Sequence, residues 1–316
     1  YIRFVISLMA KLPLAVFGAG GKLFSVWVFL AYGLGAVAYS ISLKKAWRLV
    51  LLLFVLLLPA LIGDAWVMRE SVSVWALDMG SGQSIIFSSG GKTVVVDCGS
   101  QNLSASDEVL AHFRRYNLRA IDALVLTHLD LDHASGAEEL LQKGLVKTLY
   151  MPRFQKNKEL AQRLHITAQQ AGTSVFRLSA DERASVGNIR IHLFLPPGGS
   201  GGNASSLAVM AESRGASVLI LGDINDKSDE YMAKTRDLPT VSVLVAGHHG
   251  AKTATSQTIL EKTSPKYVII SVGRNSFGHP APETLDRIEA VGAEVRRTDI
   301  NGTIFYRFYK GRVYER

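Results

Sequence analysis

The sequence predicts an α/β protein built as an αββα sandwich, preceded by a hairpin of two transmembrane helices. The long apolar runs are concentrated in the first 70 residues. From residue 72 onward, short strand-like runs alternate with amphipathic helical patterns, and the second half repeats the order of the first. Two mixed β/α halves of similar order are typical of two sheets that face each other with helices outside.

The composition excludes several other classes of protein. With 316 residues and 48% hydrophobic content, the chain has enough apolar side chains for one or two domains with real cores, which excludes a disordered chain or a fibre. Its single cysteine, Cys98, excludes an internal disulfide framework and a zinc finger built from cysteines. The mean hydropathy of +0.18 is high for a soluble protein, and the chain starts with tyrosine, so we expect a fragment of a longer membrane protein.

Two apolar runs predict the transmembrane hairpin. Residues 23–43 contain no charge, and this length of helix crosses the roughly 30 Å of bilayer hydrocarbon. The second span, at about residues 49–67, includes Asp64 and Pro59, and a proline kinks such a helix without forbidding it. The loop between the spans, residues 43–48, carries three basic residues and no acidic one, so the positive-inside rule places it in the cytoplasm. We therefore expect a membrane segment over 1–70 and a domain on the outer side over 71–316.

The outer domain is predicted to begin with a hairpin. Its strands cover residues 71–79 and 84–87, with a Gly-Ser-Gly turn at 80–82, and a further strand covers 92–96. The first half continues with a helix at 106–116 capped by Ser106, a strand at 123–126, a helix at 136–143, a strand at 148–151 and a helix at 158–171. The second half has strands at 186–195, 206–212, 217–221, 241–245 and 267–272, helices at 226–235, 256–262 and 281–291, and a closing hairpin around Asn301 and Gly302.

The clearest chemical feature is the run His-Leu-Asp-Leu-Asp-His at 128–133. It follows an apolar strand directly and precedes a helix. Because strand geometry ends there, two histidines and two carboxylates can turn toward one point, as metal ligands do. We interpret the run as a metal site rather than as a polar loop whose carboxylates cap the next helix.

Residues of the metal-ligand type also follow three later strands. Asp223 comes after the strand at 217–221, His248 and His249 after the strand at 241–245, and His279 in the loop after 267–272. Each is weak evidence alone, but together they place carboxylate and imidazole groups at the same edge of the sheets as the first motif. Asp97 ends a strand near this edge, and we expect it to make hydrogen bonds within its loop.

These motifs resemble the metallo-β-lactamase superfamily. The resemblance rests on the HxDxDH run at 128–133, Leu-Gly-Asp at 221–223 and Gly-His-His-Gly at 247–250. More narrowly, LDMGSGQS at 77–84, NASSLAV at 203–209 and SVGRNSFGHPAPETL at 271–285 resemble the outer-side domain of ComEC, the family of bacterial DNA-uptake channels of natural transformation. The resemblance implies a metallo-β-lactamase sandwich in a multi-pass protein of the inner (plasma) membrane. The domain then lies on the periplasmic or extracellular side, next to the rest of the channel chain and other DNA-uptake proteins.

The resemblance also implies ligands for two metal ions. It assigns His128 and Asp130 to one ion, and Asp223 to a bridge between the two ions. The ligands that it assigns to the second ion are Asp132, His133 and His248. Residues 203–206, Asn-Ala-Ser-Ser, stand where the superfamily usually has a histidine ligand. We expect one or two divalent ions, Mn²⁺ or Zn²⁺ with Mg²⁺ also compatible, because oxygen-rich ligand sets shift the preference from zinc toward manganese and magnesium.

The function that the resemblance implies is metal-dependent hydrolysis of DNA, acting on a single strand or a duplex end and degrading the strand that is not transported. Asp132 is the expected catalytic carboxylate, and His249 or His279 is expected to donate a hydrogen bond to phosphate or to protonate the leaving oxygen. One alternative is a non-catalytic module that binds or guides DNA at the channel. A second is a small-molecule hydrolase on the same scaffold.

The net charge of +8 is not evidence for DNA binding. Residues 1–70 contain seven basic and two acidic residues, a net charge of +5, which leaves +3 for residues 71–316. Most of the excess therefore flanks the predicted membrane spans, where basic residues set topology.

Overall fold

The computed structural model describes residues 22–39, 43–154, 156–196 and 206–315. Their fold divides into two compact units. One contains the described residues up to Glu70 together with His112–Leu118, and the other contains Ser71–Ala111 and the described residues from Arg119 onward.

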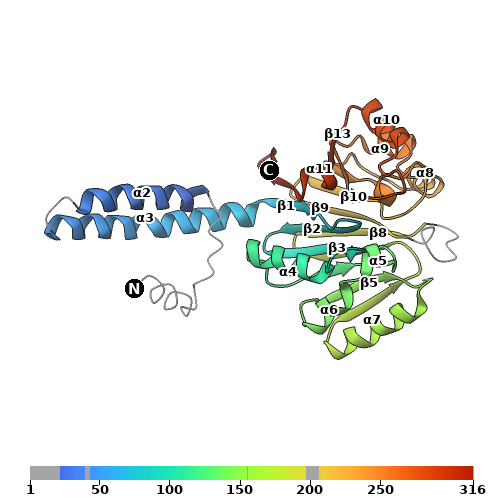
Figure 1. The fold of residues 1–316 in the computed structure, drawn as a ribbon, viewed down its shortest axis with the longest axis horizontal. Coiled ribbons are helices and arrows are strands. Elements are labelled where there is room, and N and C mark those ends of the chain that lie inside the picture. The colour runs from blue at the N-terminus through green and yellow to red at the C-terminus, as the bar shows by residue number, and fades with distance from the viewer. Residues whose placement is uncertain (1–21, 40–42, 155, 197–205, 316) are drawn as a thin grey trace. The chain divides into compact units, whose positions relative to one another are not determined.

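Two helices make up the N-terminal part of the first unit. They are α2 (Lys22–Tyr39) and α3 (Leu43–Glu70), which lie side by side (Figure 1). The backbone N–H of Leu23 donates to Asp64 Oδ1 over 3.2 Å, which ties the start of α2 to α3.

One helical segment among the described residues, Leu51–Glu70, is long and apolar enough to cross a membrane. The apolar stretch of α2, Ser25–Leu34, is shorter. The described residues therefore give one candidate span, and the hairpin of two spans is not confirmed. The loop predicted at residues 43–48 is wrong, because these residues form the first turns of α3. They contain neither glycine nor proline, and their types extend a helix readily.

Two β-sheets form the centre of the second unit. In the described residues, the first sheet has the order β15-β14-β1-β2-β3-β4-β5-β6 and the second has the order β13-β12-β11-β10-β9-β8-β7. The strands of the first sheet are β1 (Val72–Ala76), β2 (Gly82–Ser89), β3 (Lys92–Ser100), β4 (Ala123–Val125), β5 (Thr148–Pro152), β6 (Ser174–Leu178), β14 (Ile304–Tyr309) and β15 (Arg312–Glu315). Those of the second are β7 (Glu182–Val186), β8 (Ile189–Phe194), β9 (Ala208–Ser213), β10 (Ala216–Ile220), β11 (Val243–Val245), β12 (Tyr267–Ile270) and β13 (Glu294–Arg297).

Each sheet has a parallel part and an antiparallel part. Strands β3 to β6 run parallel to one another, as do β10 to β13. Because the carboxyl ends of parallel strands meet at one edge of a sheet, the loops after β3, β4, β10, β11 and β12 can share a site.

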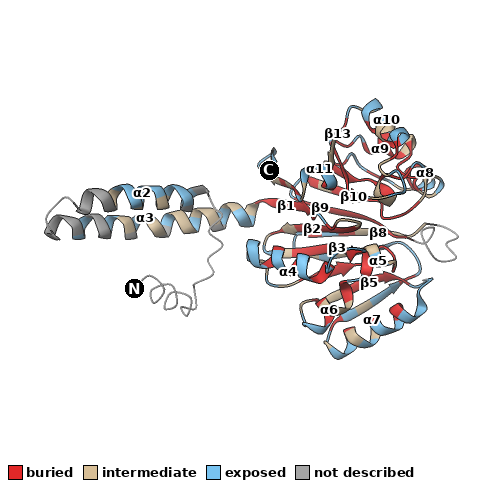
Figure 2. Cartoon of the chain, in the orientation of Figure 1, coloured by how far each residue is buried: buried red, intermediate tan, exposed pale blue. Residues whose placement is uncertain are grey.

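The core lies between the two sheets. Alternate side chains of β1 to β4, such as Val74 and Val96, pack with inward side chains of the second sheet, such as Ile191 and Val218. The outward side chains of the central strands are also buried, among them Leu219, and Figure 2 shows the central strands buried along their length. Burial on both faces is typical of parallel strands covered by helices.

Helices lie outside both sheets (Figure 1). Those of the second sheet, α8, α9 and α10, pack on its outer face through one apolar cluster. The helical elements of this part of the chain are α4 (Ala105–Tyr116), α5 (Leu131–Ala134), α6 (Ala137–Gln142), α7 (Lys158–Gln170), α8 (Asp226–Thr235), the 3₁₀ turn η2 (Gly247–Gly250), α9 (Gln257–Thr263), α10 (Pro282–Ala290) and α11 (Thr298–Asn301). The predicted αββα sandwich is therefore confirmed.

Two local predictions are wrong. Ser106 does not cap a helix, because it lies inside α4 and its hydroxyl donates to Glu139. The strand predicted at 186–195 is β8, which starts at Ile189 because the chain turns at Gly187, with a φ of 62°, after the additional strand β7. The closing hairpin does not turn at Asn301 and Gly302, because β13 belongs to the second sheet and β14 pairs with β1 and β15 in the first.

Candidate metal centre

Asp97 fixes the orientation of the histidine that ends the HxDxDH run. It is fully buried within β3, and its Oδ2 lies 2.8 Å from His133 Nδ1. Since a carboxylate only accepts, His133 Nδ1 donates its proton to Asp97, which leaves Nε2 as the atom that would bind a metal ion. Gln83 donates to the same carboxylate over 2.9 Å, which helps to hold it in place.

Asp97 also orients the other histidine of the run, His128, through Thr127. The threonine N–H and hydroxyl both donate to Asp97, over 2.8 Å and 2.9 Å. The hydroxyl oxygen therefore accepts from His128 Nδ1, 3.1 Å away. His128 is buried, and its Nε2 has no hydrogen-bond partner.

A backbone carbonyl fixes the orientation of a third imidazole, that of His249, in the same way. His249 Nδ1 lies 2.7 Å from the carbonyl oxygen of Ser271, so the proton sits on Nδ1 and the lone pair on Nε2. The Nε2 atoms of His249 and His133 are only 3.3 Å apart. Two lone pairs that face each other at this distance repel unless a cation or a proton lies beside them.

Asp223 adds negative charge at the point where these imidazoles converge. Its carboxylate is buried in the loop after β10, with Oδ1 3.1 Å from His133 Nε2 and Oδ2 3.6 Å from His128 Nε2. Oδ1 lies close to His133 but has no aligned hydrogen bond. Burial alone would raise the pKa of Asp223, but the charges of His133 and His128 outweigh it and hold the pKa well below its usual range.

The donor set fits a divalent metal ion. The ligand atoms of His133, Asp223 and His249 lie within 4.8 Å of one another, as do those of His128, Asp132 and His133. Each histidine Nδ1 is held by the protein, which is how imidazole ligands are oriented in metal sites. Burial opposes a charge on His133, yet Asp223 and Asp97 raise its pKa well above the usual value, so the negative charges around it favour a proton on Nε2, which a metal ion would replace.

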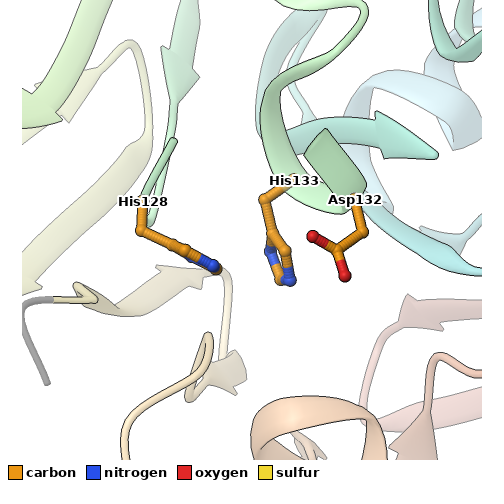
Figure 3. Close-up of side chains that lie close together, drawn as sticks. All are labelled: His128, Asp132 and His133. Carbon is orange, nitrogen blue, oxygen red and sulfur yellow. The ribbon is translucent and has the colours of Figure 1, made fainter. Parts of the chain in front are cut away.

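The two aspartates of the run, Asp132 and Asp130, differ in exposure and in their neighbours. Figure 3 shows His128 reaching toward His133 and Asp132, which project from α5. Burial acts to raise the pKa of Asp132, but the neighbouring imidazoles of His249, whose Nε2 lies 3.6 Å from Asp132 Oδ2, and of His133 lower it to about 2. Asp130 caps the start of α5 and is more exposed, with Oδ2 3.8 Å from His128 Nε2.

The remaining predicted residues, His248 and His279, lie at the outer side of the cluster. His248 Nε2 is 3.7 Å from Asp223 Oδ2, and the rings of His248 and His279 are 5.7 Å apart. Burial and the neighbouring His248 lower the pKa of His279. The structure thus brings together all eight residues named from the sequence, and it places His249, expected as a proton donor, among the ligand atoms.

Residues 203–206, which stand where the superfamily usually has a histidine ligand, are described by the structure only at Ser206. Residues 203–205 lie outside the described residues, whereas Ser206 is buried and its hydroxyl accepts from the N–H of Asp223 over 2.9 Å. This serine therefore positions the backbone of Asp223.

Backbone strain accompanies the site. His248 and His249 both have a positive φ, of 49° and 54°, and Asp97 has a φ of 60°. Such residues each cost about 1–3 kcal/mol and persist where the surroundings impose them. Here the N–H of His248 donates to the carbonyl of Gly222, which holds the turn after β11 against the loop that carries Asp223.

We predicted that Asp97 makes hydrogen bonds only within its own loop. Instead, its carboxylate orients two histidines that lie 31 and 36 positions further along the chain. A signal was present in the sequence, because Asp97 follows the apolar run 94–96 and precedes Cys98 and Gly99, so it had to be buried with them. Cys98 itself is a buried free thiol, and burial raises its pKa, which rules out a role as a thiolate nucleophile.

We predict that Asp97→Asn lowers the affinity for metal by about 10-fold to 100-fold, the usual effect of removing the group that orients a histidine ligand. An asparagine replaces one acceptor oxygen with an NH₂ group that only donates, so it cannot hold both Thr127 and His133 as the carboxylate does, and the two imidazoles lose their fixed orientation. Isothermal titration calorimetry with Mn²⁺ measures the change. Asp78→Asn is the matched control, because Asp78 is exposed and accepts only from the N–H of Gly80 in its own turn. Equal affinities of the two variants would contradict the role of Asp97.

The fold and these ligands define a class of protein. The family model of the metallo-β-lactamase superfamily matches residues 77–274, and the chain belongs to this superfamily. The crystal structure of the metallo-β-lactamase fold protein YhfI from Bacillus subtilis superposes with a TM-score of 0.51 at 14% identity, over 78% of this chain and 100% of that one. At this identity the likeness establishes the fold alone.

Two curated bacterial proteins are similar to the chain in sequence. The chain is 31% identical over 214 residues to ComE operon protein 3 of Bacillus subtilis (strain 168), a match that covers 66% of this chain and 27% of that protein. It is 26% identical over 249 residues to competence protein ComA of Neisseria gonorrhoeae, covering 78% of this chain and 33% of that protein. The resemblance to the C-terminal domain of the ComEC family is therefore confirmed, and the chain spans a third or less of the length of these relatives.

Proposed function

We propose that this domain hydrolyses DNA phosphodiester bonds with bound divalent metal ions and degrades the strand that is not transported during DNA uptake. The observation that carries the proposal is the convergence of three imidazole Nε2 atoms, of His128, His133 and His248, on the buried carboxylate of Asp223. Such a cluster suits ions that contact phosphate oxygens. The name of the relative ComA, a competence protein, supports DNA as the substrate.

The residues divide into two groups in this proposal. His133, Asp223 and His249 would hold one ion, and His128, Asp132 and His133 form an alternative set. Because Asp97 holds Nδ1 of His133, only its Nε2 is left as a ligand atom, so His133 would serve one of these two sets. Asp130 and His248 lie close enough to join them after small movements. A bound divalent ion lowers the pKa of water and neutralises charge on phosphate. Mn²⁺ or Zn²⁺ fits the mixed imidazole and carboxylate set, and Mg²⁺ suits the carboxylates alone.

The donor to the substrate is then His279 rather than His249. The Nδ1 proton of His249 is held by Ser271, and its Nε2 faces the ligand cluster, so His249 has no proton to offer. His279 lies outside the cluster beside His248, and its lowered pKa keeps it neutral near pH 7. A neutral imidazole still donates one N–H, which we assign to a phosphate oxygen or the leaving oxygen of the substrate.

We also propose the membrane arrangement that the charge pattern predicts. The domain over 71–316 lies on the outer face of an inner-membrane protein with several spans, next to the rest of the channel and other uptake proteins. One candidate span and the competence relatives support this arrangement.

A nuclease assay on the full chain in detergent tests the function. We expect cleavage of 5′-labelled single-stranded DNA with Mn²⁺, Zn²⁺ or Mg²⁺, none in EDTA, and loss of cleavage in the Asp132→Ala/His133→Ala variant. DNA binding without cleavage under any metal would favour the guiding module instead. Hydrolysis of a lactone but not of DNA would favour a small-molecule hydrolase.

A further inference from the structure

An exposed phenylalanine stands at the rim of the metal centre. Phe277 lies in the loop 273–280 between β12 and α10, and its side chain is 74% exposed. Among the described residues after position 70, it is the most exposed large hydrophobic side chain. Single exposed apolar residues are common on protein surfaces, so exposure alone assigns nothing.

The loop that carries Phe277 is held rigidly by one side chain. Asn275 Oδ1 accepts from the N–H of Phe277 over 3.1 Å and from the N–H of His279 over 3.0 Å. Its Nδ2 donates to the carbonyls of Gly273 and His279 over 2.9 Å and 2.8 Å. Four hydrogen bonds to one half-buried amide group restrict the shape of the loop, so Phe277 loses little conformational freedom when a ligand binds.

The same loop is anchored to the metal centre at its start. Ser271, which holds His249, precedes it directly, and its hydroxyl donates to the carbonyl of Gly82 over 3.0 Å. At Gly273 the backbone passes so close to Gly80 that an added Cβ would lie 2.3 Å from the carbonyl carbon of Gly80. Phe277 is therefore fixed relative to the ligands, although its ring faces solvent.

A series of rings leads from Phe277 to the ligand cluster. The ring centroids of Phe277 and His279 are 5.9 Å apart, with the planes inclined by only 32°. His279 lies 5.7 Å from His248, whose Nε2 is 3.7 Å from Asp223. A planar group placed on Phe277 is thus two rings away from the metal centre.

We propose that Phe277 is a stacking surface for an unpaired nucleobase next to the cleaved phosphate, and that the loop 273–280 forms a binding subsite for single-stranded nucleic acid. This proposal rests on the proposed function, because it needs a nucleic acid at the metal centre. Every base offers a π-face, so an aromatic stacking surface binds single strands with little sequence preference. A fully paired base inside a duplex has no free face, so duplex DNA uses this surface only at a frayed end.

Arg274 on the same loop adds a positive charge. Its side chain is exposed, and no carboxylate of the described residues lies within ion-pair distance. A guanidinium and an aromatic ring on the same exposed loop match the alternation of phosphates and bases along a single strand. This charge acts on every phosphodiester chain, whereas the stacking acts only where a base is present.

The test compares two substrates on the full chain in detergent with Mn²⁺. One is a single-stranded oligonucleotide, and the other is an oligomer of the same length and charge that carries abasic residues throughout. We expect Phe277→Ala to raise the KM for the normal oligonucleotide by about fivefold to 150-fold, the range for loss of one stacked base, and to leave the KM for the abasic oligomer unchanged. Phe277→Trp restores the wild-type KM.

Two further variants make the test specific. Phe176→Ala removes another exposed aromatic side chain, on β6, and is expected to change neither KM. Arg274→Gln is expected to weaken both substrates alike and to reduce the salt slope of binding by about one.

Equal losses of Phe277→Ala on both oligomers, or no loss on either, would overturn the proposal, and equal losses would mean that Phe277 acts on the loop or on the sugar-phosphate chain rather than on a base. Fluorescence anisotropy of the same oligomers in the Asp132→Ala/His133→Ala background reads binding without cleavage. If the wild type cleaves neither oligomer, the nuclease function fails, while a selective loss of binding in Phe277→Ala still supports the stacking surface.

Discussion

Asp223→Asn is expected to remove metal binding from the cluster and to abolish any metal-dependent hydrolysis. The two carboxylate oxygens point to different imidazoles, Oδ1 to His133 and Oδ2 to His128 and His248. An amide keeps one of these oxygens and loses the negative charge that the ions need. The loss of metal affinity is therefore expected to exceed the roughly 10-fold to 100-fold cost of disturbing a group that only orients a ligand.

Elemental analysis after dialysis, together with titration calorimetry, measures the bound metal. Asp226→Asn is a matched control, because Asp226 lies three positions further along and its side chain accepts from the N–H of Lys227 at the start of α8. Wild-type metal content in Asp223→Asn would show that the cluster does not depend on this carboxylate.

Gly99→Ala is expected to have the largest effect on stability. A Cβ at Gly99 would lie 2.1 Å from the backbone nitrogen of His133 and 2.2 Å from the carbonyl carbon of Asp132. Since both are backbone atoms, β3 or α5 must move, and overpacking of this kind costs about 3 kcal/mol or more. The movement also displaces two ligand residues, so metal affinity falls together with the melting temperature.

Differential scanning calorimetry with and without Mn²⁺ measures both effects. Gly144→Ala is the control, because Gly144 has a φ of 66° and open space around it, so its variant suffers only the backbone cost of about 1–2 kcal/mol. A Gly99→Ala variant that is no less stable than Gly144→Ala would show that the close approach of β3 and α5 is not required.

Much of the fold was predictable because it depends on local patterns. The apolar runs at 94–96, 123–126 and 243–245 are strands buried on both faces, as the sequence indicated. The closing hairpin was misplaced because Asn301 and Gly302 form a good turn signal, whereas the true turn at Lys310 and Gly311 follows from the pairing of β14 with β15. Strand pairing across the sheet depends on residues far apart in sequence, and local turn signals do not report it.

The candidate ligands were predictable because four of them are adjacent in the run 128–133 and the others follow strands of the same kind. The positioning groups were harder to predict. Thr127 and Asp97 act through contacts across the sheet, and Ser271 acts through a backbone carbonyl, which no residue type reveals.

The sequence by itself determined the α/β class, the order of most strands and helices, and the set of residues that gather at the edge of the sheets. Only the tertiary structure decided which atoms of those residues are available. His249 directs its Nε2 to the cluster because the carbonyl of Ser271, 22 positions further along, holds its Nδ1. His133 directs its Nε2 there because Asp97, 36 positions before it, holds the Nδ1 of His133. The protonation and direction of an imidazole depend on its hydrogen-bond partners, and chain folding brings those partners together.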